Sequence, residues 1–452
     1  MKNIRIIISA LLILFLAGCD VLDVEPYHSI PADQAITRKA DVESAINGVY
    51  SSLQAVGYYG RNYVVVGDLT ADNLEWTGTT AGYNQIDNNS ILADNVIVEG
   101  MWSAMYSTIN RANHVLAALP QLETTNEISS AERKAFEAEM LFIRALTHFD
   151  LARLFGPVPI RNAVATADDD DLNVPRQPLG KVFESVDNDL AYAAEHIREN
   201  IVRGKASKAA AHALMARVKL YEYAKTNDSK LLEDADSLAT LVLENYGLNL
   251  EPDYARLFDG NPNNESIFEV NFGEQDRNRF AEYFFPTALS GRREFSPTDD
   301  LYNAFHDDDV RRDVSIASDG DNIYGFKYHD IETGTDNVYV LRLAEMYLIR
   351  AEALTMQAKR LDEARDDINA IRERAGLEPI TTTTQAQLEK EIMDMRRLEF
   401  AFEGHRWFDL VRTGKAIDVL DGITQECEYL FPIPLGELLT NFHEGMNQND
   451  CY

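Results

Sequence analysis

The chain has 452 residues, and 45% of them are hydrophobic, so it is long and apolar enough to bury a large core. Its 74 acidic residues outnumber the 42 basic ones and give a formal net charge of −32. A surface this acidic repels phosphate groups, which argues against nucleic acid as a partner.

Residues 1–18 have the form of a lipoprotein signal peptide. A cationic start precedes an apolar run over residues 6–17 that is too short to span a bilayer. Small residues directly before Cys19 are typical of a site where the cysteine is lipidated and becomes the mature N-terminus. The alternative is a plain signal peptide followed by an incidental cysteine. We expect residues 19–452 to form a single unit anchored to a membrane through Cys19.

The other two cysteines are Cys427 and Cys451, and both would then lie in an oxidising compartment. We predict a disulfide between them. The alternative is two free or metal-bound thiols, but the sequence has no CxxC motif and no neighbouring histidine pair to support a metal site. We therefore expect no metal and no cofactor.

Apolar residues recur at three- and four-residue spacing along much of the chain, which predicts a mainly α-helical protein. Pro120 is expected to stop the second predicted helix. Paired helices in series suggest tetratricopeptide-like hairpins. The predicted helices cover residues 33–53, 99–119, 131–155, 181–198, 205–224, 230–246, 340–358 and 361–375. The helical scaffold would thus span roughly 32–56, 99–157, 179–248 and 340–414, with irregular segments at roughly 57–98, 249–339 and 415–452.

A further helical hairpin is predicted over residues 391–414, with its break at Gly404. Glu399 and Glu403 lie one turn apart on it, a like-charge pair that needs neighbouring cations. The predicted partners are the nearby Arg396, Arg397, Arg406 and Arg412. Two such carboxylates could also be the acid and base of a glycosidase. Arginines beside them would keep both ionised, which favours the structural interpretation, and we expect no catalytic residues.

Several stretches resemble signatures of the SusD/RagB family of outer-membrane lipoproteins, and the resemblance runs from one end of the chain to the other. The stretches are FIRALTHFDLARLFGPVPI (142–160), VPRQPLGKVFESVDNDLAYA (174–193), ESIFEVNF (265–272), RRLEFAFEGHRWFDLVRTGK (396–415), YLFPIP (429–434) and the final NQNDCY (447–452). One departure is Cys451, where the family ending more often carries a small residue.

The resemblance implies four tetratricopeptide-like hairpins with an irregular, inserted face that binds glycans. It also implies a cell-surface lipoprotein of the outer membrane that captures oligosaccharide or polysaccharide. Such a protein delivers the glycan to a SusC-like TonB-dependent transporter and acts as the transporter's lid, without being an enzyme. Acidic residues soon after Cys19 resemble the signal that sends some of these lipoproteins to the cell exterior.

A sugar site needs an exposed flat aromatic ring with hydrogen-bonding side chains around it. Trp76 fits best, because the other two tryptophans lie on amphipathic helices where core packing is expected. The alternative is that Trp76 is buried within its own loop. The predicted contact residues of this first stretch are Asp72, Asn73, Trp76, Tyr83 and Asn84.

A second stretch, residues 277–295, interleaves arginines with aromatic residues, and it contributes Tyr283, Phe285 and Arg292 to the predicted glycan site. Its positive charge could receive an acidic sugar. The alternative is that these arginines neutralise the nearby run from Asp307 to Asp309.

A helical-repeat lipoprotein that binds another protein and no glycan is the main rival function, because concave repeat surfaces readily bind peptides.

Overall fold

The computed structural model describes residues 35–165, 172–320 and 322–452. The predicted signal peptide and the predicted lipidation site Cys19 lie outside these residues.

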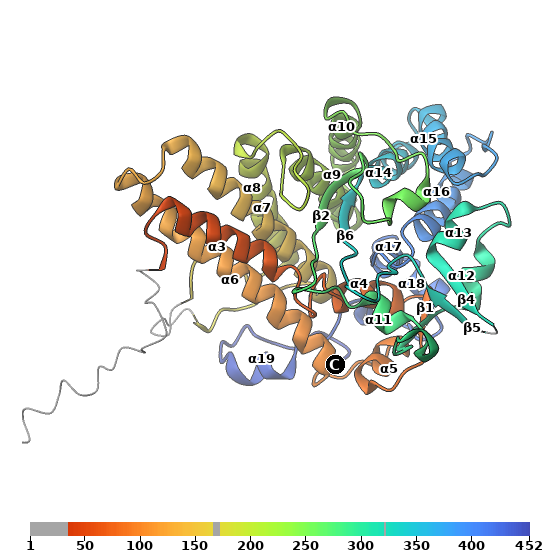
Figure 1. The fold of residues 1–452 in the computed structure, drawn as a ribbon, viewed down its shortest axis with the longest axis horizontal. Helices are drawn as coiled ribbons and strands as arrows, with labels where there is room; N and C mark the ends of the chain where they lie inside the picture. The colour runs from red at the N-terminus through yellow and green to blue at the C-terminus, as the bar shows by residue number, and fades with distance from the viewer. Residues whose placement is uncertain (1–34, 166–171, 321) are drawn as a thin grey trace, which may run out of the picture.

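Long helices make up most of the described chain, and each packs mainly against the next one along the sequence. In Figure 1 they form an arc that begins with α3, α6 and α7 and continues through α8, α9 and α10 to α14, α15 and α16. This arrangement is the predicted stack of tetratricopeptide-like hairpins. The helices are α3 (Lys39–Ser52), α6 (Val96–Thr124), α7 (Ser130–Phe155), α8 (Leu179–His196), α9 (Lys208–Thr226), α10 (Ser229–Asn245), α14 (Leu343–Met356), α15 (Leu361–Arg374) and α16 (Gln385–Glu399).

Polar side chains fix where several of these helices begin. The side chain of Asn95 accepts hydrogen bonds from the backbone N–H groups of Ile97 and Val98 at the start of α6. Ser129 and Glu132 form a reciprocal capping box at the start of α7. Helix α7 then ends at Gly156, whose φ of +72° is a conformation that glycine adopts without strain.

Helix α6 does not stop at Pro120 as predicted, but continues to Thr124. Proline removes one backbone donor, so it deletes a single hydrogen bond of the helix. Pro120 lies near the C-terminal end and its ring is exposed, which leaves the buried face of α6 intact. Burial of Leu119 and Leu122 on that face outweighs the loss.

The predicted irregular segments contain short ordered elements. Three two-stranded antiparallel ribbons occur within the described ranges: β1 (Leu74–Trp76) with β3 (Phe295–Pro297), β2 (Ser266–Val270) with β6 (Val338–Arg342), and β4 (Ile316–Asp319) with β5 (Asn322–Gly325). The short helices are α4 (Asn62–Leu69), α5 (Ala81–Asp87), α11 (Phe280–Phe284), α12 (Asp299–Ala304), α13 (Val310–Ser315), α17 (Arg406–Arg412), α18 (Ala416–Val419) and α19 (Leu435–Thr440), with single 3₁₀ turns at Tyr254–Leu257, Thr287–Leu289 and Glu426–Tyr429. Figure 1 shows β1, β4, β5, α5 and α11 gathered on one side of the helical arc.

Glu399 and Glu403 lie in a buried ion-pair network, but their partners are not the predicted ones. Glu399 pairs with Arg342 at 2.5 Å, with Arg311 at 3.1 Å and also with Arg374. Although burial raises the pKa of Glu399, these guanidinium groups together lower it below its usual value.

The four arginines predicted to serve this pair bind other carboxylates. Asp409 pairs with Arg396 at 2.7 Å and with Arg412 at 2.9 Å, while Asp72 pairs with Arg406 at 2.6 Å and with Arg397 at 3.1 Å. The side chains nearest in sequence point away from Glu399 and Glu403, so the chain pairs these glutamates with cations from distant elements.

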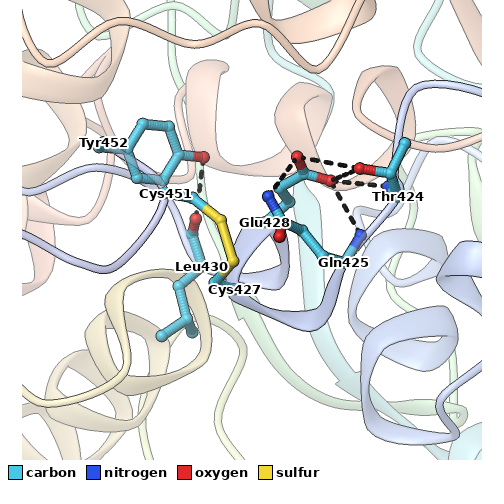
Figure 2. The surroundings of a disulfide bond; sticks show 7 residues. All are labelled: Thr424, Gln425, Cys427, Glu428, Leu430, Cys451 and Tyr452. Atoms are coloured by element: carbon cyan, nitrogen blue, oxygen red, sulfur yellow. Dashed lines mark hydrogen bonds between the residues drawn. A yellow bond between two sulfur atoms is a disulfide. The ribbon is translucent and has the colours of Figure 1, made fainter.

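The predicted disulfide between Cys427 and Cys451 is confirmed, with the two Cα atoms 5.8 Å apart (Figure 2). The Tyr452 hydroxyl donates to the Leu430 carbonyl at 3.0 Å beside it. The last residues of the chain are therefore joined to the segment before the YLFPIP motif.

The described part of the chain contains no helix that is long and apolar enough to cross a membrane.

Candidate functional site

The two stretches predicted to bind glycan meet in space, because they form the two strands of one ribbon. Strand β1 pairs with β3 so that Trp76 lies opposite Phe295 and Leu74 opposite Pro297. Helix α5 follows β1, and helix α11 precedes β3. Residues more than two hundred positions apart in the sequence thus share one surface of the protein.

Trp76 is half-buried on this ribbon. Alternate residues of a strand point to opposite faces, so Trp76 shares its face with the buried Leu74, whereas Glu75 is exposed. No described atom accepts a hydrogen bond from the buried indole Nε1 of Trp76. Trp76 is partly buried and packs against the core. Its exposure is therefore intermediate between the predicted open platform and the alternative of a buried loop tryptophan.

A stack of cationic and aromatic side chains lies behind the ribbon. The guanidinium carbon of Arg61 lies 3.7 Å from the centre of the Tyr283 ring and 5.9 Å from that of Tyr83. The guanidinium carbon of Arg292 also lies over the Tyr283 ring, 4.8 Å from its centre. The Nη1 of Arg292 donates a hydrogen bond to the Tyr283 hydroxyl at 3.1 Å. Arg292 is exposed, with 49% of its side-chain surface accessible. These contacts hold Arg292 in place at the surface.

Three aromatic residues predicted as exposed contacts are buried instead. Tyr83 is 1% exposed and donates its hydroxyl to Asn62 Oδ1 at 2.7 Å, and burial raises its pKa to about 12. Phe285 packs against Tyr324, with ring centres 5.0 Å apart. Tyr283 is only 9% exposed. Large rings in loop-like sequence still bury apolar area when the loop folds back onto the core. These rings support the surface and do not form it.

Asp72 and Asn73 are also occupied within the protein. The Asp72 carboxylate accepts two hydrogen bonds from Arg406, at 2.6 and 2.7 Å, and Arg406 lowers its pKa despite the opposing effect of burial. Asn73 is fully buried, and its amide donates to Asp68 at 2.7 Å. Both side chains fasten the start of β1 to the helical hairpin. Of the predicted contact residues, Arg292 is exposed and Trp76 and Asn84 are half-buried, and Asp72 is also half-buried but already paired with Arg406.

A pocket lined by aromatic residues lies elsewhere and was not predicted. Trp102 and Tyr106, one turn apart on α6, pack against each other with ring centres 4.8 Å apart and ring planes tilted by 50°, beside a cavity of about 290 Å³. Trp102 Nε1 donates to Glu437 of α19 at 3.2 Å. The spacing of the two rings, followed by Asn110 and Asn113 on the same helix, is the sequence signal that could have indicated it. Because Trp102 itself is 4% exposed, its assignment to the core is correct.

The described residues include no group of three or more histidine, cysteine, aspartate or glutamate side chains placed to hold a metal ion.

Two family models match the sequence. One, described as the SusD family, matches residues 322–423, and the other, described as starch-binding associating with outer membrane, matches residues 20–220.

Individual relatives agree with these matches. The SusD-like protein P2 of Formosa agariphila is 28% identical over 98% of both chains. The starch-binding protein SusD of Bacteroides thetaiotaomicron is 33% identical over 149 residues, which cover 30% of this chain and 25% of that protein. A laminarin-binding SusD-like protein of known structure has the same fold, with a TM-score of 0.81, 24% identity and coverage of 92% of this chain and all of that one. The chain belongs to the SusD/RagB family.

Proposed function

We propose that the protein captures oligosaccharide or polysaccharide at the cell surface and delivers it to a SusC-like TonB-dependent transporter, over which it acts as a lid. The observation that carries this proposal is the end-to-end likeness to a SusD-like protein and to a laminarin-binding protein of known structure, together with a partial match to a starch-binding protein. The family description as starch-binding and associated with the outer membrane supports the same location.

The surface around β1 and β3 is the proposed glycan contact. Trp76 would offer the edge of an apolar ring, while Arg292 and Asn84 would hydrogen-bond sugar hydroxyls. Glu75 adds an exposed carboxylate whose pKa is raised by partial burial and by the nearby Asp87 and Asp299. A few polar groups placed around one aromatic edge suit a sugar ring.

Native gels that contain purified polysaccharides test glycan capture. We expect at least one polysaccharide of a panel that includes starch and laminarin to retard the protein, since weak binding suffices when the next transfer step is intramolecular. Unchanged mobility in every gel, for a protein shown to be folded by circular dichroism, would overturn the proposal.

An exposed apolar patch supports a protein partner. On α19 and just after it, Leu439 is 63% exposed and Phe442 is 82% exposed. The Leu435 N–H donates to the Ala93 carbonyl at 2.8 Å, which places α19 beside the start of α6, where Val96 is 67% exposed. Exposed apolar residues gathered in this way are typical of an interaction surface. We assign the patch to the transporter.

The variant Leu439→Asp/Phe442→Asp tests this assignment. It should co-purify with the transporter less than the wild-type protein does, while its mobility in polysaccharide gels stays the same. Co-purification of a different protein, together with no retardation by any glycan, would favour the rival protein-interaction function.

The lipid anchor is tested by Cys19→Ser in the full-length chain. We expect the wild-type protein in the outer-membrane fraction and accessible to protease added to whole cells, and the variant in the soluble fraction. Wild-type protein that stays protected from the protease would contradict the exterior orientation.

A further inference from the structure

A groove of about 420 Å³ lies between the end of α3, the middle of α6 and residues 275–279. Three arginines line it, Arg111 from α6 and Arg277 and Arg279 from the segment before α11. All three are exposed. The volume is within the range of about 300–1,000 Å³ that small-molecule sites occupy.

Two of these arginines are not engaged with carboxylates. Arg111 Nη1 donates to the Gly48 carbonyl at 3.3 Å, and Arg277 Nη2 donates to the Glu332 carbonyl at 2.6 Å. Within the described ranges neither forms an ion pair, although the protein has 74 acidic residues. Backbone carbonyls orient both guanidinium groups but leave their charge uncompensated.

The alternative role considered for the arginines of this stretch, neutralisation of the acidic run 307–309, is wrong. Asp307 pairs with Arg312 at 3.3 Å, Asp308 lies 3.4 Å from His306, and the buried Asp309 pairs with Arg311 at 2.6 Å. Each carboxylate of that acidic run already has a basic side chain close to it in sequence as a partner. The arginines of the groove therefore need another explanation.

The positive charge continues from the groove toward the proposed glycan contact. Glu282 on α11 accepts a hydrogen bond from Arg279 at 2.5 Å and lies 3.8 Å from Arg292. One carboxylate is thus shared by two arginines, and a second, Asp276, lines the groove. Three arginines and one aspartate leave a net positive groove on a strongly negative protein.

We propose that this groove binds the carboxylate or sulfate groups of an acidic polysaccharide whose chain extends over α11 to Arg292. A guanidinium group offers two parallel N–H donors that match the oxygens of a carboxylate or sulfate. The exposed Gln275 and Ser107 and the half-buried Gln54 also line the groove and supply neutral donors and acceptors for hydroxyls. On a protein of net charge −32, a local cluster of positive charge favours binding of an anionic ligand at this groove. This inference rests on the proposed glycan-binding function and narrows it to acidic glycans.

Dextran sulfate and dextran make a matched test, because they share a backbone and differ in charge; polygalacturonate adds a carboxylated polymer. Binding of each to the purified mature protein is measured by calorimetry at low and at physiological salt. We expect dextran sulfate or polygalacturonate to bind at least about tenfold more tightly than dextran, and the preference to weaken as salt rises.

The variant Arg111→Gln/Arg277→Gln/Arg279→Gln should lose at least about tenfold in affinity for the anionic polymer. Its charge-matched control is Lys225→Gln/Lys230→Gln/Lys390→Gln, which removes three exposed cations from α9, α10 and α16 and should stay within about twofold of wild type. Equal losses of affinity in the two variants, or no loss in the arginine variant, would overturn the proposal that the groove binds the anionic polymer. If the protein bound neutral glycans alone, anion binding at the groove would be overturned, but the proposed glycan capture would stand. A folded protein that binds no glycan at all would overturn both.

Discussion

At the scale of single residues, His148 on α7 is a buried histidine held in one protonation state. It is 1% exposed, its Nδ1 lies 3.1 Å from the Arg144 carbonyl, and the Arg161 N–H donates to its Nε2 at 3.2 Å. Because Nε2 accepts a hydrogen bond, the proton is on Nδ1 and the ring is neutral. Burial and the Arg144 charge lower its pKa from 6.5 to about 3.

This shift predicts a loss of stability in acid. The folded state binds the His148 proton more weakly than the unfolded state, so the contribution is fully present above pH 6.5 and is lost as pH falls from 6.5 toward 3. Across that window the free energy of unfolding should fall by about 1.4 kcal/mol per pH unit because of this group.

Urea unfolding of wild type and His148→Gln between pH 7 and 4 measures the effect. The stability difference between the two proteins should shift steadily in favour of the variant as pH falls. Parallel curves for wild type and His148→Gln would contradict the assignment.

The site residues show what local sequence can and cannot predict. The mixture of aromatic and polar residues around Trp76 and Arg292 singled out two distant stretches, which the structure joins in one ribbon. It did not reveal that Tyr83 and Phe285 are buried, because burial depends on which distant segment covers a ring. Likewise, Glu399 pairs with Arg311, Arg342 and Arg374 from separate elements, and no spacing rule for one helix could identify them.

At the scale of elements, α4 approaches the turn between α16 and α17 very closely. A Cβ atom added at Gly67 would lie 2.5 Å from the Gly404 carbonyl oxygen and 2.7 Å from its Cα. Gly404 itself has a φ of +76°. Two glycines therefore allow backbone-to-backbone contact where a side chain has no room.

Gly67→Ala should destabilise the protein by about 3 kcal/mol. The clashing atoms belong to the backbone, so α4 and the turn at Gly404 would have to move apart. Gly48→Ala on α3 is the matched control: nothing lies within 4 Å of its added Cβ, and alanine in a helix should stabilise by about 0.5–1 kcal/mol. Thermal unfolding of both variants measures this. Equal effects in the two would show that the contact is not needed.

The disulfide between Cys427 and Cys451 closes a loop with a sequence separation of 24. Cys427→Ser/Cys451→Ser should lower the free energy of unfolding by about 3 kcal/mol through the larger entropy of the unfolded chain. Denaturant titration of the oxidised wild type, the reduced wild type and the variant checks this. Identical midpoints for all three would mean that the bridge adds nothing to stability.

Helical periodicity predicted the long helices well, because each buries one apolar face against its neighbour along the chain. It failed for α4, a run of eight residues that are all buried, since an element buried on every side shows no amphipathic period. It also failed at Pro120, where tertiary packing outweighs one lost hydrogen bond. Strands of three to five residues, such as β1 and β2, depend on partners too far away in the sequence to predict.

At the scale of the whole molecule, a stack of helices presents the ribbon of β1 and β3, the arginine groove that continues toward it, and the apolar patch near α19. The patch shares no residue with the other two surfaces, so a ligand and a protein partner can be tested independently. Under the proposed function, the work of this surface is to hold a glycan long enough for transfer to the transporter.

The most direct test of this account is the affinity of Trp76→Ala for whichever polysaccharide retards the wild-type protein. Isothermal titration of wild type, Trp76→Ala and the distant control Phe442→Ala provides it. We predict that Trp76→Ala raises Kd at least about tenfold, a loss of about 1.4 kcal/mol, while the control binds as wild type does. Three indistinguishable isotherms would contradict glycan binding at the β1 and β3 surface.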